Sequence, residues 1–517
     1  MIAASTKEEM MFNAYYQKYA HDGSLPYVGR LLQRAAHEYS HAPAIMGEEG
    51  SYTYLQLYQQ AVVLSKQLLE RGIKPRDRVL LFMHNSPAYY VAYFAILQVG
   101  AVVTPLNIFL REQEFSHIMR DSDPAFIICS TSLLEIVRNA QTDKPLPPMM
   151  TEHDMSMEVS GDELPLFDPI CLDSHEMAAL LYTSGTTGLP KGVMLSSHNI
   201  MTNILQGISL FHATEKDRVL AVLPLFHSFA QNTYIWAPFF VGASVIIVPK
   251  IERRFILKAF EYKPTILAAV PAFYGLLCLL KTVPLESCRI FVSGGDALPD
   301  KIRAGFSLLY RRKICSGYGL TETAPFVAGC LDDEAMPANT VGRPLPGIRC
   351  VLKDEQGKEV APGTIGELWL KGPNIMLGYY NAPQATADVL VDGWLSTGDL
   401  AYVDEKGRIV ISGRYKDIII HKGFKIYPQE IENVLISHPQ VIRAAVIGVA
   451  DEASGQVPVA YVQIKEDNPG IEHELKKLCE SMLAAYKVPR SFICSTQGLP
   501  TTATGKIDKK ALQRHHE

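Results

Sequence analysis

The sequence predicts an α/β protein with more than one domain, and three observations support this. The chain has 517 residues, of which 48 % are hydrophobic, so it can bury a large core and exceeds the usual size of one domain. Short apolar runs rich in β-branched residues recur along it, and amphipathic segments separate them. This alternation indicates parallel strands covered by helices. The runs lie at 78–84, 243–249, 265–271 and 289–295, and one amphipathic segment lies at 199–211.

The pattern changes after about residue 340. Glycine-bounded strands at 366–372 and 407–414 indicate a more antiparallel region. A charged stretch at 414–430 then leads into a helix, two strands and a second helix, which together make a unit of about 100 residues, a usual domain size. We therefore expect an N-terminal domain over 1–413, a hinge over 414–416 and a C-terminal domain over 417–517.

Composition excludes several classes of function. The net charge of −5 provides no basic face for nucleic acid. Nine scattered cysteines without a CxxC pair fit a reduced cytoplasmic protein rather than a disulfide framework or a zinc site. The N-terminus has no apolar segment of the signal-peptide type. Two uncharged stretches, 89–106 and 232–249, contain Gly and Pro and are expected to be a buried helix followed by a buried strand. Peripheral membrane contact and oligomerisation stay open.

The stretch from Tyr182 to Gly192, YTSGTTGLPKG, holds four Ser/Thr hydroxyls, three glycines and a lysine. Backbone N–H groups in such a loop form an anion-binding concavity, to which the hydroxyls add donors. Pro190 and Gly192 flank Lys191, so this is not a Walker A loop, which needs Gly before the Lys and Ser/Thr after it. We expect a strand that leads into a phosphate-binding loop, and a following helix capped by Ser196 or Ser197.

This loop resembles the signature of the adenylate-forming enzymes, which include acyl-CoA synthetases, luciferases and peptide-synthetase adenylation domains. Further motifs match in the family's order: LPLFHSFA (223–230), SGGDALP (293–299), GYGLTET (317–323), VGRPLPG (341–347), GELWLKGPNIMLGYY (366–380), DGWLSTGDL (392–400), GRYKDIIIHKGFKIYPQEIE (413–432) and PTTATGKIDKKAL (500–512). The resemblance implies two doubly wound sheets and a β-subdomain in the N-terminal domain, followed by a mobile C-terminal α/β domain.

The resemblance also implies a two-step reaction. A carboxylate attacks the α-phosphate of ATP and expels pyrophosphate, and a thiol then attacks the acyl-adenylate and releases AMP. The implied roles are phosphate binding by Thr183, Ser184, Gly185, Thr186, Thr187, Gly188 and Lys191; lining of the adenine site by Gly294, Gly295 and Asp296; ATP or AMP binding by Gly317 and Gly319; stacking on adenine by Tyr318; a bond to the α-phosphate from Thr321; Mg²⁺ binding by Glu322; and ribose binding by Asp399 with Arg414. The specific role of Asp296 stays open, because relatives often carry a small residue there.

The resemblance assigns the main chemical step to Lys506, which would reach the α-phosphate and the substrate carboxylate. The thiol step would require this lysine to leave, through rotation of the C-terminal domain about Lys416. The rotation would place Gly423 beside the coenzyme A channel, where the absence of a Cβ lets a chain pass closely.

The acid and the thiol are less determined. His227, Phe229, Val292 and Leu320 would form the acyl pocket, with His227 also counted among the catalytic residues, although His227 alone fits a core histidine equally well. No acidic residue in LPLFHSFA pairs with an ammonium group, so we expect a medium- or long-chain fatty acid. An aryl acid, a carrier protein that accepts the acyl group in trans, a luciferase and a non-catalytic nucleotide-binding homologue are the alternatives. The expected small molecules are ATP, Mg²⁺ and coenzyme A.

Overall fold

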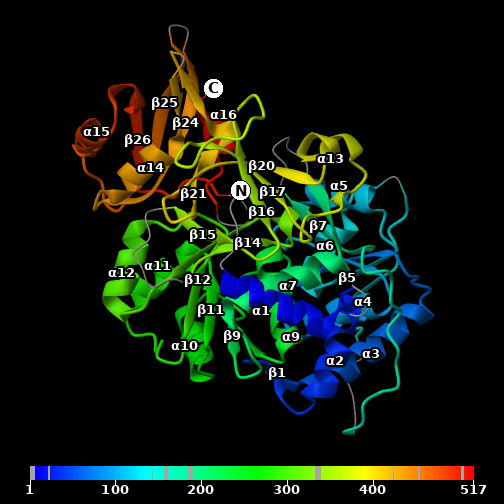
Figure 1. Ribbon diagram of the computed structural model, residues 1–517. Coiled ribbons are helices and arrows are strands. Elements are labelled where there is room, and N and C mark those ends of the chain that lie inside the picture. The colour runs from blue at the N-terminus through cyan, green and yellow to red at the C-terminus, as the bar shows by residue number, and fades with distance from the viewer. Residues whose placement is uncertain are drawn as a thin grey trace.

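A computed structural model shows a large N-terminal unit and a small C-terminal unit that join near residue 415 (Figure 1). It describes residues 6–20, 24–142, 144–155, 161–183, 190–331, 339–422, 424–451, 454–501 and 506–516. The main core of the N-terminal unit runs from Phe12 to Ile409, and a separate core from Ile419 to Phe492 lies in the C-terminal unit. The predicted hinge at 414–416 falls between these cores; its motion stays a prediction.

The first sheet of the N-terminal unit has seven strands, in the order β18-β8-β7-β4-β3-β5-β6. The strands from β7 to β6 in this order are parallel, and β8 and β18 extend the sheet antiparallel. Ser86 caps helix α4, because its side chain accepts a hydrogen bond from Tyr89 N, and the buried helix leads to the buried strand β4. The stretch 89–106 is thus a buried helix and strand, as predicted. The bounds are β3 (Arg78–Phe82), β4 (Val102–Pro105), β5 (Phe126–Cys129), β6 (Met149–Thr151), β7 (Met177–Thr183), β8 (Lys191–Ser196), β18 (Gly378–Tyr379), α3 (Tyr54–Glu70), α4 (Pro87–Gln98), α5 (Glu112–Ser122), η2 (Thr131–Leu133) and α6 (Leu134–Arg138).

The second sheet is also doubly wound, and its parallel strands follow the order β13-β12-β11-β9-β10-β1. The stretch 232–249 is again a buried helix followed by a strand, β10, as predicted. The bounds are β1 (Pro43–Gly47), β2 (Gly50–Thr53), β9 (Arg218–Ala221), β10 (Ser244–Ile247), β11 (Ile266–Ala269), β12 (Ile290–Ser293), β13 (Cys315–Gly319), α1 (Thr6–Tyr19), η1 (Val28–Arg30), α2 (Leu31–Glu38), α7 (Ser197–Phe211), α8 (Ser228–Ala230), the π-helix η3 (Gln231–Trp236), α9 (Ala237–Val241), α10 (Arg253–Glu261), α11 (Pro271–Leu280), α12 (Asp300–Tyr310) and η4 (Thr321–Thr323).

The second sheet continues beyond β13 into the antiparallel strands that the glycine-bounded segments predicted. This β-subdomain lies between the helices around the second sheet and the C-terminal unit (Figure 1). Its bounds are β14 (Phe326–Gly329), β15 (Thr340–Pro344), β16 (Arg349–Lys353), β17 (Gly366–Lys371), α13 (Pro383–Val389), β19 (Leu390–Val391), β20 (Trp394–Val403) and β21 (Ile409–Arg414).

The C-terminal unit packs α14 and α15 on a five-stranded sheet in which β24 and β25 form a long antiparallel pair. Pro428 occupies the first turn of α14, as predicted. Lys301 Nζ of α12 donates to the carbonyl oxygens of Pro439 (3.1 Å) and Val441 (3.4 Å), so the unit contacts the N-terminal unit in this orientation. The bounds are η5 (Tyr415–Asp417), β22 (Ile419–His421), β23 (Phe424–Ile426), α14 (Pro428–Ser437), β24 (Val441–Asp451), β25 (Gly455–Ile464), α15 (Ile471–Met482), η6 (Ala485–Lys487), β26 (Ser491–Ser495) and α16 (Lys509–His516).

The architecture confirms the predicted fold class of two doubly wound sheets, a β-subdomain and a small C-terminal α/β unit. Within the residues that the structure describes, no helix is both long enough and apolar enough to cross a bilayer.

Candidate active site

A cavity of about 2940 Å³ lies where the second sheet, the β-subdomain and the C-terminal unit meet. Every described residue to which the sequence assigned a site role lines it: Thr183, Lys191, His227, Phe229, Val292, Gly294, Gly295, Asp296, Gly317, Tyr318, Gly319, Leu320, Thr321, Glu322, Asp399, Arg414, Lys416 and Lys506. The candidates Ser184, Gly185, Thr186, Thr187, Gly188 and Gly423 lie outside the described residues.

Lys191 begins strand β8, which runs antiparallel to β7, and here the structure differs from the expected strand, loop and helix. Thr183 at the end of β7 pairs with Lys191 at the start of β8. Val193 and Leu195 of β8 are buried, so alternation of side chains keeps this segment in the sheet. The predicted cap is present one strand later, because Ser196 Oγ accepts a hydrogen bond from Asn199 N (3.0 Å) at the start of α7.

Lys191 and Glu322 both contact Tyr379, a residue to which the sequence assigned no role. Lys191 Nζ lies 5.3 Å from the centre of the Tyr379 ring, and the Tyr379 hydroxyl donates to Glu322 Oε1 (2.8 Å). Among the described residues, Glu322 Oε2 has no hydrogen-bond partner. The arrangement places one cation and one carboxylate oxygen on the cavity near the start of β8. Tyr379 was missed because GYY by itself indicates no contact partner.

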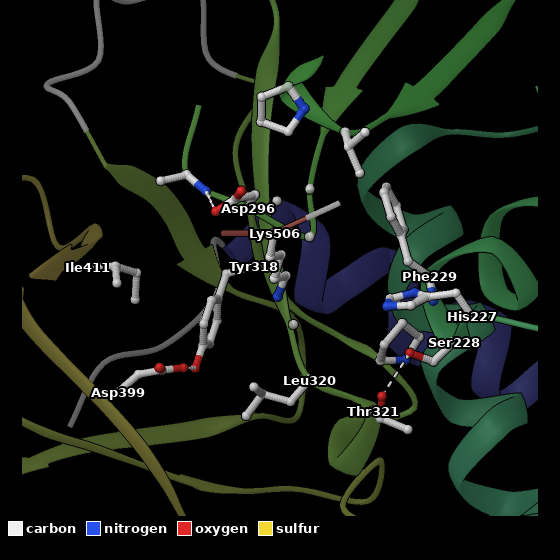
Figure 2. Close-up of a pocket in the computed structure, with 18 of the residues that line it drawn as sticks. His227, Ser228, Phe229, Asp296, Tyr318, Leu320, Thr321, Asp399, Ile411 and Lys506 are labelled. Carbon is white, nitrogen blue, oxygen red and sulfur yellow. Dashed lines mark hydrogen bonds between the residues drawn. The ribbon is translucent and has the colours of Figure 1, made fainter. Parts of the chain in front are cut away.

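Thr321 and His227 face the cavity near each other (Figure 2). Thr321 Oγ1 lies 3.2 Å from Ser228 Oγ, which fixes the hydroxyl at the first turn of η4. His227 Nδ1 accepts a hydrogen bond from Phe229 N (3.2 Å). Burial, reinforced by the charge of Lys506, lowers the pKa of His227 to about 4, so the ring is neutral near pH 7. With Nδ1 as acceptor, the neutral ring carries its proton on Nε2.

Asp399 joins the β-subdomain to the second sheet. Its Oδ2 accepts a hydrogen bond from the Tyr318 hydroxyl (2.5 Å), and its Oδ1 lies 3.3 Å from Arg414 Nε. The β20–β21 register sets this pair, because Asp399 lies opposite Arg414. The buried carboxylate therefore has both oxygens on the cavity side of the sheet, beside an aromatic ring and a cation.

Lys506 of the C-terminal unit reaches into the cavity. Figure 2 shows its side chain between Tyr318 and Asp296 on one side and His227 and Phe229 on the other. Burial lowers the pKa of Lys506, as does Arg414, while Asp296 and Asp399 oppose the shift. No described residue accepts a hydrogen bond from the ammonium group. A partly buried ammonium group that no described residue pairs is suited to meet an anionic substrate.

Two glycines, Gly294 and Gly317, lie beside the aromatic rings at the mouth of the apolar part of the cavity, and their lack of a side chain leaves room there. A Cβ on Gly294 would lie 3.2 Å from the Phe229 ring, and a Cβ on Gly317 would lie 3.2 Å from the Phe326 ring. Each is tighter than most real contacts, so a larger residue at either position would displace an aromatic ring that lines the cavity.

Beyond this mouth the cavity extends as a mainly apolar channel along α8, η3 and α9, although Asn232, Thr233 and the carboxylate of Asp217 also line the cavity. Phe229, Thr233, Ala237 and Val241 are partly exposed, four residues apart, on helices whose other residues are mostly buried. The opposite wall comes from α7 and from both ends of the parallel strands: Gly207, Ile208, Phe211, Val219, Ala243, Ile266, Ala268 and Val270. The sequence did not reveal this channel, because a helix buried on all sides does not show which face meets a cavity rather than packed side chains.

Comparisons with known proteins agree with this geometry. The model of the AMP-binding enzyme family matches residues 32–380, and that of the AMP-binding enzyme C-terminal domain matches residues 430–506. The chain belongs to the AMP-binding enzyme family. Its membership confirms the resemblance to the acyl-CoA synthetase branch of the adenylate-forming enzymes and the predicted class, an AMP-forming acid–thiol ligase. ATP and coenzyme A are substrates of the family.

Relatives of this family member differ in the acid that their names give. A Long-chain-fatty-acid--CoA ligase of Bacillus subtilis (strain 168) is 30 % identical over 535 residues, covering 94 % of this chain and 95 % of its own. A Feruloyl-CoA synthase of Amycolatopsis sp is 34 % identical over 497 residues, covering 94 % and 98 %. Among solved structures, ATP-bound MatB from Rhodopseudomonas palustris has a TM-score of 0.86 at 29 % identity, covering 94 % of this chain and 99 % of that one.

Proposed function

We propose that this chain activates a medium- or long-chain fatty acid to an acyl-adenylate and then transfers the acyl group to coenzyme A. The observation that carries the proposal is the apolar channel that leads inward from Phe229. Phe229, Ala237, Val241 and Ile208 present mainly hydrocarbon to it, which is the surface that an alkyl chain requires.

The depth of the channel supports a medium- or long-chain aliphatic acid. Strands β9 and β11 have four residues each, about 13 Å, and the lining includes Val270, just beyond the carboxyl end of β11, and Val219 near the amino end of β9. From Phe229 to Val241 the helices advance roughly 15–18 Å. A chain of single bonds advances about 3.5 Å for every three bonds, so a depth of about 13–18 Å corresponds to roughly eleven to fifteen bonds and to an acid of about twelve to sixteen carbons.

The residues around the mouth have complementary parts in adenylate formation. In this proposal, Lys506 and the Nε2–H of His227 offset charge on the carboxylate and the α-phosphate while a carboxylate oxygen bonds to phosphorus. The bond between the α-phosphorus and the oxygen bridging to the β-phosphate breaks, and pyrophosphate leaves beside Lys191. Thr321 donates to the α-phosphate, Tyr318 stacks on adenine, and Asp399 with Arg414 binds the ribose. Donors preorganised in a buried site supply much of such catalysis.

Glu322 is suited to hold Mg²⁺. Tyr379 occupies only Oε1, which orients the carboxylate and leaves Oε2 for a cation. Mg²⁺ commonly takes one or two protein carboxylates and completes its shell with water and substrate phosphates, so the site does not require a cluster of acidic residues. When bound, the ion would neutralise charge on the triphosphate.

The thiol step requires space that Lys506 occupies. We infer that the C-terminal unit turns about Lys416 after adenylation, as a gating motion of the kind that often limits turnover. The thiol sulfur then bonds to the acyl carbon, AMP leaves with the electrons of the acyl–phosphate bond, and the thiol proton passes to solvent. The predicted role of Gly423 in this state concerns a residue outside those described.

One observation favours an aryl acid as the second candidate. Phe229 and Phe326 approach the mouth next to Gly294 and Gly317, which carry no side chains, so a flat ring fits between them. The Feruloyl-CoA synthase among the relatives is consistent with this alternative.

Acid-dependent exchange of labelled pyrophosphate into ATP tests the proposal. The panel comprises butanoate, octanoate, dodecanoate, benzoate and 3-phenylpropanoate, and the control is the same chain with Lys506→Ala. The proposal predicts that exchange rises with chain length to about dodecanoate and that the control loses it. Faster exchange with both aryl acids would favour the second candidate, and no exchange with any acid would overturn both.

A further inference from the structure

A buried chain of amide side chains lies behind one wall of the channel. Asn232 Nδ2 donates to Asn203 Oδ1 (2.9 Å), and Asn203 Nδ2 donates to Gln206 Oε1 (2.9 Å). Gln206 Nε2 in turn donates to Pro346 O (2.7 Å). Asn203 and Gln206 are fully buried and Asn232 is 6 % exposed, so these groups must satisfy one another rather than water.

Backbone groups determine which end of each amide is oxygen. Asn203 Oδ1 accepts from Phe326 N (3.0 Å), and Asn203 Nδ2 donates to Phe326 O (2.7 Å). If Oδ1 and Nδ2 of Asn203 were exchanged, the NH₂ group would face the N–H donor of Phe326 and the oxygen would face the carbonyl acceptor of Phe326. Because the atom of Asn203 that faces Asn232 is therefore an acceptor, the atom of Asn232 that meets it must be Nδ2. The other end of Asn232 is its carbonyl oxygen.

The Asn232 oxygen reaches the channel. Asn232 lines the cavity, and no described residue donates to Oδ1. A fully buried Oδ1 without a donor would be an unsatisfied polar atom, and Asn232 Oδ1 is not one of these. It therefore has surface exposed to the cavity. Thr233, the neighbouring polar residue on the wall, differs, because its hydroxyl already donates to Phe229 O (2.7 Å). Asn232 thus presents one open acceptor in a mainly apolar channel, three residues past Phe229.

We propose that Asn232 Oδ1 accepts a hydrogen bond from a hydroxyl group on the acid, and that the preferred substrate is a hydroxylated acid. This inference rests on the proposed function and refines its substrate class. A hydrocarbon placed against an amide oxygen removes water from it without replacing the hydrogen bond, which is unfavourable, whereas a hydroxyl restores the bond. The donor is either a hydroxyl on an alkyl chain near its carboxyl half or a phenol.

Paired acids distinguish these two sources. In pyrophosphate exchange, we compare decanoate with 3-, 5- and 10-hydroxydecanoate, and 3-phenylpropanoate with its 4-hydroxyphenyl analogue. The wild type is expected to favour one hydroxylated acid over its parent by about tenfold in kcat/KM. The 10-hydroxy isomer serves as a control, because its hydroxyl lies at the far end of the channel.

The variant Asn232→Leu has similar volume and no acceptor. Asn203 Oδ1 keeps its bond from Phe326 N, so the amide chain behind the wall remains satisfied. The ratio of kcat/KM for the hydroxylated acid to kcat/KM for its parent should fall to about one or below. The matched variant Thr233→Val should keep the preference, whatever its overall rate. Acyl sulfamates made from the hydroxylated acid and from its parent are stable mimics of the adenylate. Their affinities, measured by calorimetry, should show the same loss of preference without turnover.

The outcomes separate this inference from the proposed function. Exchange with decanoate that is equal to exchange with every hydroxylated acid would overturn the role of Asn232 and leave the ligase proposal standing. So would a preference that survives Asn232→Leu. If Asn232→Leu does not fold, the wild-type ratios alone decide. No exchange with any of these acids would overturn the ligase proposal itself.

Discussion

Closing the channel at Gly207 tests its use by the acyl chain. Gly207 lies on α7 and lines the cavity, and a Cβ built on it would meet only Phe326 Cδ1, at 3.9 Å. The space beside it therefore belongs to the channel rather than to packed side chains. In Gly207→Leu, the new side chain extends into that space without a forced clash at Cβ.

The expected effect depends on the length of the acid. If the introduced isobutyl group displaces about four methylenes of a long acyl chain, the loss is about 3 kcal/mol of burial, at ~0.8 kcal/mol for each methylene. That is a fall of roughly 200-fold in kcat/KM for dodecanoate. Butanoate does not reach this depth, so its kcat/KM should change by less than about threefold.

The assay is AMP release with coenzyme A and butanoate, octanoate or dodecanoate. Gly207→Ala is the matched control, because one methyl group fits the space at Cβ. It should keep most activity with dodecanoate and raise the free energy of unfolding by about 0.5–1 kcal/mol, as Ala replaces Gly inside a helix. An equal loss on all three acids in Gly207→Leu, or no loss on dodecanoate, would refute the channel.

Three other predictions concern Lys506, His227 and Lys301. Lys506→Ala should slow adenylate formation by about 10²–10³-fold but spare coenzyme A transfer from a supplied acyl-adenylate; rapid-quench measurement of both steps checks this, and equal loss in both would contradict it. The His227 pKa of about 4 lies below the unfolded value of 6.5, so the unfolded chain binds this proton first on acidification. His227 should therefore lower the free energy of unfolding by about 3 kcal/mol as pH falls from 6.5 to about 4. Urea unfolding of His227→Gln should lack this part of the pH-dependent loss of stability. Lys301→Ala removes the two bonds to Pro439 and Val441; it should slow adenylation several-fold while coenzyme A transfer stays equal or faster, and the reverse order would contradict a latch in the adenylation orientation.

The sequence predicted the layers of the fold well, because buried parallel strands have a clear signature. The run at 243–249 is apolar and β-branched, and β10 forms within it. The hairpin at Lys191 was missed, because a glycine- and proline-containing segment reads as a loop until its partner strand is known. Strand β8 depends on pairing with β7, which a local pattern does not show.

The motifs predicted the residues of the candidate site, but they did not predict the residues that contact those side chains or line the channel. Residues as distant as Lys191 and Lys506 line the same cavity, as the order of the motifs implied. Tyr379 and Asn232 act through contacts across 57 and 29 residues of sequence, and no local signal announces such pairs. The channel was missed for the same reason, since its shape depends on which face of a buried helix lacks neighbours.

The most direct test of the acid–thiol ligase assignment separates its two half-reactions. The purified chain is mixed with ATP, Mg²⁺ and dodecanoate without a thiol, the bound products are quenched and identified, and a parallel sample is chased with coenzyme A. The account predicts pyrophosphate and enzyme-bound dodecanoyl-adenylate before the chase, then dodecanoyl-CoA and AMP in equal amounts after it. Release of ADP and phosphate, or a bound adenylate that coenzyme A does not convert, would contradict it.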